Sequence, residues 1–91
     1  MGSSTYKVPD GKMIKVRLEV ENNRIQSLTI LGDFFLHPED TIIEIEKGLL
    51  GSEAVIDELS SVVTDILEEN KAILIGATAN DIARAIMMAV D

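Results

Sequence analysis

The chain has 91 residues, of which 46% are apolar and 26% are charged, and it contains no cysteine. These values are typical of one globular domain. The lack of cysteine excludes disulfides, thiolate metal sites, iron–sulfur clusters and cysteine nucleophiles. No apolar run approaches the roughly twenty residues that span a bilayer, and the start has no signal-peptide pattern. We therefore expect a soluble, cytoplasmic protein that does not enter a membrane.

The charge of the chain is strongly acidic and unevenly spread. The formal net charge is −8. Residues 1–24 carry five bases and three acids, a net charge of +2, whereas the remaining 67 residues carry three bases and thirteen acids, a net charge of −10. This balance argues against a general nucleic-acid binder, because phosphate contacts need clustered lysine and arginine. Solvation of exposed faces is the simplest explanation of the acidic half.

The first regular element follows a turn signal. Residues 1–10 are treated as a flexible or extended start, and the Val-Pro-Asp-Gly sequence at 8–11 favours a turn. Residues 12–20 then alternate between apolar and polar side chains, which predicts a half-buried strand. The apolar face of this strand would carry Ile14, Val16, Leu18 and Val20.

A second strand is expected over residues 24–31, paired with the first as a hairpin. A three-residue loop over 21–23 places Leu28 and Ile30 on the apolar face of the first strand. A loop of the two asparagines alone would instead place Ser27, Thr29 and Leu31 on that apolar face. A shift of one residue in the pairing moves every side chain of a strand to the opposite face. We therefore predict the three-residue loop, with Asn23 in the left-handed backbone region.

The sequence Gly-Asp-Phe-Phe-Leu-His-Pro over residues 32–38 marks the change from strand to helix. Gly32 is expected there because glycine takes backbone angles that a Cβ forbids, and Pro38 suits the first residue of a helix. Core burial is the default for Phe34 and Phe35, but neighbouring residues of an extended stretch point in opposite directions. One exposed ring beside the preceding aspartate would suit a protein–protein contact.

Two helices are predicted next. The first spans residues 38–50 and ends at Gly51. Its buried stripe would be Ile42, Ile45 and Leu49. Ser52 would cap the second helix, over residues 53–69, which ends at Asn70. Its stripe follows the helical repeat closely and comprises Val55, Ile56, Leu59, Val62, Val63, Ile66 and Leu67.

The last third of the chain adds two elements. Residues 72–75 form a short apolar run, either a third strand or a buried connector, and we favour the strand. Thr78 and Asp81 have the spacing of a capping box for a final helix. Its stripe would contain Ile82, Ile86 and Val90. The sequence thus predicts an α+β fold: a small antiparallel sheet, formed by the hairpin and a short third strand, packed in two layers against about three helices.

Residues with catalytic chemistry are few. The single histidine, His37, has no partner at metal-ligand spacing, and a structural role at a helix start is favoured over catalysis. The paired acids lie on charged helical segments, where solvated surface explains them. The Gly-Ala-Thr sequence at 76–78 lacks the lysine of a phosphate-binding loop. We therefore expect no catalytic residue, no metal site and no cofactor site in this chain.

Three motifs in order suggest a family. They are Gly-Lys-Met-Ile-Lys-Val at 11–16, Ile-Leu-Gly-Asp-Phe-Phe at 30–35 and Ile-Glu-Lys-Gly-Leu-Leu-Gly at 45–51. The motifs lie within residues 11–51, and this region resembles the small C-terminal accessory domain of lipoate–protein ligases. The resemblance is weaker from Asn70 onward. It implies a single domain over residues 1–91.

The resemblance also implies a function. In such ligases a large domain binds lipoate and ATP with magnesium, forms lipoyl-adenylate and transfers the lipoyl group to a carrier lysine. The acceptor would be the lipoyl carrier domain of a 2-oxoacid dehydrogenase or the glycine cleavage H protein. This chain would be the non-catalytic small subunit of a split ligase, in a heterodimer with the catalytic large subunit, and would enable lipoate adenylation. An excised domain remains an alternative.

The partner interface is expected at the corner after the hairpin. The hypothesis is that the basic hairpin and this corner dock on the catalytic subunit and order its adenylate-binding loop. The candidate interface residues are Lys12, Gly32, Asp33, Phe34 and Phe35. Lys12 could lie near the nucleotide or the interface, although an exposed lysine at a strand start is the simpler interpretation. A generic interaction module using the acidic helical face is the alternative function, and an independent enzyme is a third.

Overall fold

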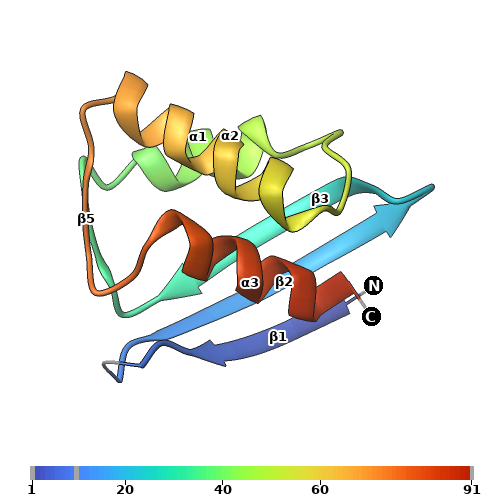
Figure 1. The fold of residues 1–91 in the computed structure, drawn as a ribbon, viewed down its shortest axis with the longest axis horizontal. Helices are drawn as coiled ribbons and strands as arrows, with labels where there is room; N and C mark the ends of the chain where they lie inside the picture. Colours follow the sequence, from blue (N-terminus) through green and yellow to red (C-terminus); the bar gives the residue numbers. More distant parts are fainter. Residues whose placement is uncertain (1, 10, 91) are drawn as a thin grey trace.

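The computed structural model describes residues 2–9 and 11–90. Within this range the chain forms five strands and three helices. They are β1 (Gly2–Lys7), β2 (Met13–Glu21), β3 (Arg24–Gly32), β4 (Phe35–His37), α1 (Thr41–Gly48), α2 (Ile56–Glu69), β5 (Ile73–Ile75) and α3 (Ala79–Val90). The helices lie together on one face of the β1–β2–β3 sheet, and β4 and β5 stand at one end of it (Figure 1). The predicted two-layer α+β architecture is confirmed.

The main sheet has a strand that the sequence did not indicate. β1 pairs antiparallel with β2, so the order is β1–β2–β3. β1 is rich in small hydroxyl residues and has no apolar alternation, and it is held partly by a side-chain bond from Ser4 Oγ to the Ala85 carbonyl of α3 (2.6 Å). The strand predicted at 72–75 also forms, as β5, but it pairs with β4 in a separate two-stranded sheet. Asp10 of the predicted turn lies outside the described residues.

The side chains of the hairpin face the core as predicted, but its loop is shorter than predicted. Leu28 and Ile30 lie opposite apolar residues of β2 and are buried, as expected. The loop is the two residues Asn22 and Asn23, with φ of 54° and 62°, so the three-residue loop is wrong although Asn23 is left-handed as predicted. Two positive φ angles are typical of a type I′ turn, for which asparagine is well suited.

A β-bulge reconciles the short loop with the buried face. The register shifts between Glu19 and Val20, so that Glu19 lies opposite Ser27 and Val20 lies opposite Ile25. Gln26 is therefore the extra residue of β3. Ile25, which the bulge turns inward, is 1% exposed. The bulge thus gives β3 an apolar inner face along its whole length.

Helix α1 begins later than predicted. Pro38 is not its first residue, since the helix starts at Thr41. Residues 38–40 form a turn in which the Thr41 N–H donates to the Pro38 carbonyl at 3.0 Å, a bond to the third residue back rather than the fourth. The His37–Pro38 peptide is cis. Ile45 and Leu49 of the predicted stripe are fully buried, whereas Ile42 is partly buried.

Helix α2 also begins later than predicted, because the residues before it pair with the hairpin. The Ile25 N–H donates to the Ser52 carbonyl at 3.0 Å, and Glu53 forms an isolated bridge with Arg24. Ser52 is therefore not the cap, and the helix starts at residue 56 instead of 53. Tertiary hydrogen bonds to the edge of β3 outweigh the local helical pattern. The predicted end at Asn70 is confirmed.

Helix α3 begins with the predicted reciprocal cap. The Thr78 N–H donates to Asp81 Oδ2 (2.9 Å), and the Asp81 N–H donates to Thr78 Oγ1 (3.1 Å). These bonds satisfy backbone donors that have no partner within the helix. The buried face of α3 mixes large and small side chains, namely Ile82, Ala83, Ala85, Ile86 and Ala89. Alanine lets this helix lie close against β1 and β2.

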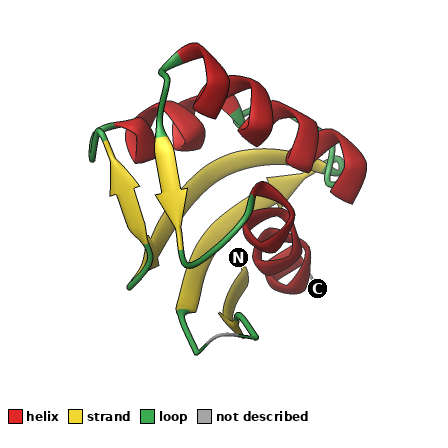
Figure 2. Cartoon of the chain, turned by 60° about the vertical axis from the view of Figure 1, so that its left-hand side comes forward, coloured by secondary structure: helices red, strands yellow, loops and turns green. Residues whose placement is uncertain are grey.

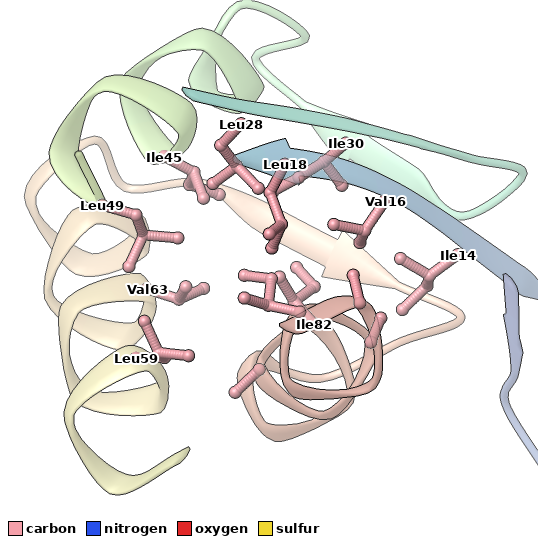
Figure 3. Close-up of a cluster of buried hydrophobic side chains, with 14 of the residues drawn as sticks. Ile14, Val16, Leu18, Leu28, Ile30, Ile45, Leu49, Leu59, Val63 and Ile82 are labelled. Carbon is pink, nitrogen blue, oxygen red and sulfur yellow. The ribbon is translucent and has the colours of Figure 1, made fainter. Parts of the chain in front are cut away.

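The core lies between the inner face of the sheet and the three helices of the described chain (Figure 3). Ile14, Val16 and Leu18 point from β2 toward α3, which carries Ile82, while Leu59 and Val63 come from α2 at the side. One predicted core residue is outside it. Val55 precedes α2 and is 44% exposed, because the residues before α2 turn toward the hairpin.

Candidate functional site

Asp33 closes the end of the hairpin at the corner between β3 and β4. Its Oδ1 accepts a hydrogen bond from the Met13 N–H (2.7 Å), and its own N–H donates to the Met13 carbonyl (3.2 Å). Together these bonds extend the β2–β3 pairing by one residue. The carboxylate is exposed, but its closest contact is with the backbone of its own chain. Asp33 therefore shapes the corner.

Gly32 is needed at the corner for space and not for its backbone angle. Its φ is outside the left-handed region occupied by other glycines of this chain, so the expectation based on backbone freedom is wrong. A Cβ built at this position would overlap the ring of Phe34 and would lie 2.6 Å from the Met13 carbonyl oxygen. The glycine allows the ring and the neighbouring strand to approach the β3 backbone closely.

The two phenylalanines differ in environment, as expected for neighbours in an extended stretch. Phe34 lies over Gly32 and packs partly buried against the core. Phe35 points away and is 55% exposed. Its ring stacks on that of His37, with centroids 6.3 Å apart and ring planes at 9°. His37 belongs to β4 and not to a helix start, so Phe35 and His37 share one exposed face.

β4 and β5 form a two-stranded ribbon apart from the main sheet (Figure 2). The outer face of this ribbon exposes apolar side chains. Phe35 lies opposite Ile75, and His37 lies opposite Ile73. These two isoleucines are 59% and 54% exposed. The middle residue of each strand points inward. Leu36 of β4 is buried, and its partner Leu74 of β5 is partly buried and packs against the core. The inner face thus joins the core while the outer face remains open.

Leu31 connects the ribbon to the outer face of the main sheet. It is 61% exposed and lines a shallow depression together with Phe34, Phe35 and residues from the start of α1. On its other side it lines a second depression with Met13 and Lys15. Five exposed side chains therefore form a continuous surface, which we name the apolar strip. Its members are Met13, Leu31, Phe35, Ile73 and Ile75.

Lys12 reaches the edge of the apolar strip from another part of the chain. Its aliphatic stem lies over Gly76, directly after β5, where a built Cβ would be 2.9 Å from Lys12 Cγ. Gly76 has φ +95° and no side chain, so the stem can lie flat against the backbone. The structure thus brings Lys12 close to Ile75, although the two residues are far apart in the sequence.

The comparison with protein families gives the context of this surface. Residues 5–86 match the family described as the bacterial lipoate protein ligase C-terminus. The chain belongs to this family. The resemblance based on residues 11–51 is confirmed, and the match extends over α2, β5 and most of α3, where the sequence motifs are weaker.

Two relatives of this ligase C-terminal domain come from Thermoplasma acidophilum. Lipoate-protein ligase A subunit 2 is 36% identical over 69 residues, which cover 76% of this chain and 70% of that protein. A solved chain from work on an archaeal lipoylation system, described as a bi-partite lipoate protein ligase and its E2 lipoyl domain, has a TM-score of 0.78 and 32% identity. The match covers 92% of this chain and 91% of that chain. Sequence and fold agree along nearly the whole domain.

The predicted site residues of this ligase domain divide into two groups. Gly32, Asp33 and Phe34 contact one another or the hairpin, while Phe35 and Lys12 present exposed atoms at the apolar strip. Sequence reasoning missed Met13, Leu31 and the two isoleucines of β5 as interface residues. The signal was present, because both β5 isoleucines alternate around an inward leucine, but their pairing with Phe35 and His37 is not visible in sequence.

Residues 2–9 and 11–90 hold neither a metal-ligand cluster nor a membrane-spanning helix. This range contains no group of three or more histidine, aspartate or glutamate side chains placed to hold a metal ion. No helix within it is long and apolar enough to cross a membrane. The feature of this domain that suits binding is the apolar strip.

Proposed function

We propose that this chain is the accessory subunit of a two-chain lipoate–protein ligase, which binds the catalytic subunit and enables it to form lipoyl-adenylate from lipoate and ATP. The proposal is carried by the match to a chain of a bi-partite ligase, which covers 91% of that chain, so the domain corresponds to almost the whole of it. Similarity to a protein named as subunit 2 of a ligase supports the same assignment.

The proposal divides the reaction between two chains. Lipoate and ATP with Mg²⁺ bind the catalytic subunit, and the lipoyl group passes to the lysine of a carrier domain. This chain contributes binding free energy at the corner formed by Lys12, Gly32, Asp33, Phe34 and Phe35. Binding at that corner favours the conformation of the catalytic subunit in which its adenylate-binding loop is ordered. A partner that binds one conformation more tightly shifts the population toward it.

The experiment is lipoate-dependent exchange between ATP and pyrophosphate by the catalytic subunit, with and without this chain. We expect exchange to rise steeply with added chain and to saturate at one equivalent. Transfer of lipoate to a carrier domain, measured in parallel, separates an effect on adenylation from an effect on the second step. Unchanged exchange together with unchanged transfer would contradict the proposal and favour a binding module that uses its acidic helical face.

A further inference from the structure

We infer that the apolar strip is the surface on which the catalytic subunit docks, with Phe35 and Ile75 at its centre. The inference rests on the proposed function and specifies its interface. Of the expected interface residues it retains Phe35 as a direct contact and Lys12 at the rim. It assigns Gly32, Asp33 and Phe34 to shaping the corner, because Asp33 accepts the Met13 N–H and the partly buried Phe34 ring lies against Gly32.

The apolar strip gathers exposed apolar side chains in one place. The strip includes Phe35, Ile75 and Leu31, which are 55%, 59% and 61% exposed and are adjacent through cross-strand pairing and a shared depression. Other exposed large apolar side chains come from separate elements, such as Ile43 of α1 and Met88 of α3. Contiguous apolar patches usually mark interaction sites, whereas single exposed apolar residues are common.

The ribbon of β4 and β5 holds its outer side chains rigidly. The ribbon side chains are β-branched or aromatic and stand on paired strands whose inner residues join the core. The Phe35 ring is further restricted by stacking on His37 at 6.3 Å. Side chains that are already ordered lose little conformational freedom on binding. Aromatic anchors of this kind carry much of the affinity of protein interfaces.

The strip is apolar and has charged groups of both signs at its borders. None of its five residues is charged, and the nearby basic groups are Lys12, over Gly76, and Lys15, opposite Leu31. Asp33 lines the same depression as Lys15, and Glu39 lines the depression at the α1 side. The net charge of the whole molecule is −8.

A different protein fits this surface better than a second copy, because two molecules of charge −8 repel each other. A complementary partner presents an apolar centre with carboxylates opposite Lys12 and Lys15. The catalytic subunit required by the proposed function is the partner to which the strip is assigned.

The test compares matched exposed residues on and off the strip. Ile75→Thr and Phe35→Thr remove apolar surface while keeping a side chain that suits a strand. Ile43→Thr makes the same change as Ile75→Thr at an exposed position of α1 (46% exposed). Affinity for the catalytic subunit is measured by calorimetry, and circular dichroism checks the fold. We expect each strip variant to weaken binding about tenfold or more, and Ile43→Thr to change it less than about twofold.

The outcomes distinguish the inference from the proposed function. Folded strip variants that bind with native affinity would overturn the inference. The proposed function would still hold in that case if the wild-type chain stimulates exchange between ATP and pyrophosphate. A wild-type chain that fails to bind the catalytic subunit would remove both. Sedimentation tests whether the wild-type chain associates with itself. Self-association that is lost in Ile75→Thr would assign the strip to a second copy and would also overturn the inference. If the ribbon variants misfold, Leu31→Thr on the longer strand β3 makes the same comparison.

Discussion

Asp33 and Gly32 act on the corner through contacts with backbone atoms. The carboxylate of Asp33 accepts the Met13 N–H at 2.7 Å, and the missing side chain of Gly32 lets the Phe34 ring lie against β3. Both residues belong to the end of the hairpin that supports Phe35. Their influence on binding is therefore indirect, through the position of the strands.

At Asp33 the hydrogen bond can be removed without changing the core. Asp33→Ala should lower the free energy of unfolding by about 1 kcal/mol, because the exposed Met13 N–H loses its carboxylate acceptor and bonds to water instead. Asp33→Asn keeps an acceptor oxygen and should lose less. Urea unfolding followed by circular dichroism measures both; equal losses in the two variants would contradict the role of the hydrogen bond.

At Gly32 an added methyl group should be costly. Gly32→Ala should destabilise the protein by about 1–3 kcal/mol, because the Cβ overlaps the Phe34 ring and approaches the Met13 carbonyl at 2.6 Å. Combining it with Phe34→Ala should cost less than the sum of the single changes, since the ring clash is removed. Thermal and urea unfolding of the four proteins measure this coupling. If the destabilisations of the two single variants add exactly in the double variant, the clash with the Phe34 ring is not what makes Gly32→Ala costly.

Among the elements, α3 has the most clearly defined beginning. The Thr78 side chain accepts the Asp81 N–H at 3.1 Å, and the Asp81 carboxylate accepts the Thr78 N–H at 2.9 Å. Thr78→Ala should lower stability by about 1 kcal/mol, and Thr78→Ser should be nearly neutral. Urea unfolding gives both values. An alanine variant as stable as the wild type would show that water replaces the cap.

The predictability of each element depended on whether its signal was local. The α3 cap and the alternation of β2 are local patterns, and both are confirmed. The starts of α1 and α2 were misplaced, because turn bonds and pairing with β3 decide them. β1 was missed since Ser4 and its neighbours carry no apolar alternation, and their place is set by β2 and α3.

The candidate site was predicted in part for the same reason. The motif around residues 32–35 identified the corner from sequence, and the exposure of one phenylalanine followed from strand geometry. Ile73 and Ile75 could not be assigned, because only the pairing of β5 with β4 places them beside Phe35. Residues that meet across a long sequence separation leave no local pattern.

For the whole molecule, charge follows the two layers. The open face of the sheet exposes Lys7, Lys15 and Arg17, against Glu19 and Glu21. The helical layer carries most of the acids, which explains the contrast between the first 24 residues and the rest. The uneven charge along the sequence is thus a difference between the sheet layer and the helical layer, whose arrangement Figure 1 shows.

This separation predicts how docking depends on salt. Affinity for the catalytic subunit should fall several-fold as ionic strength rises, because Lys12 and Lys15 border the apolar strip and salt screens exposed charges. Lys12→Gln should reduce that dependence. Lys47→Gln, on the last turn of α1, is the matched control and should not alter it. Titrations at several salt concentrations measure the slope; identical slopes for all three proteins would contradict a lysine-bordered interface.

The contact between β1 and α3 has a consequence for the order of folding. Ser4 bonds to Ala85, and Gly2 lies against the carbonyl of Ala89, so elements at opposite ends of the described chain complete each other. Contacts of such long sequence separation form late, because a large loop must close before they gain any free energy. The β1–β2 and β2–β3 hairpins can both pair locally, but β1 has its complete native surroundings only after α3 has docked. The contact of β1 with α3 should therefore form in the step that closes the core.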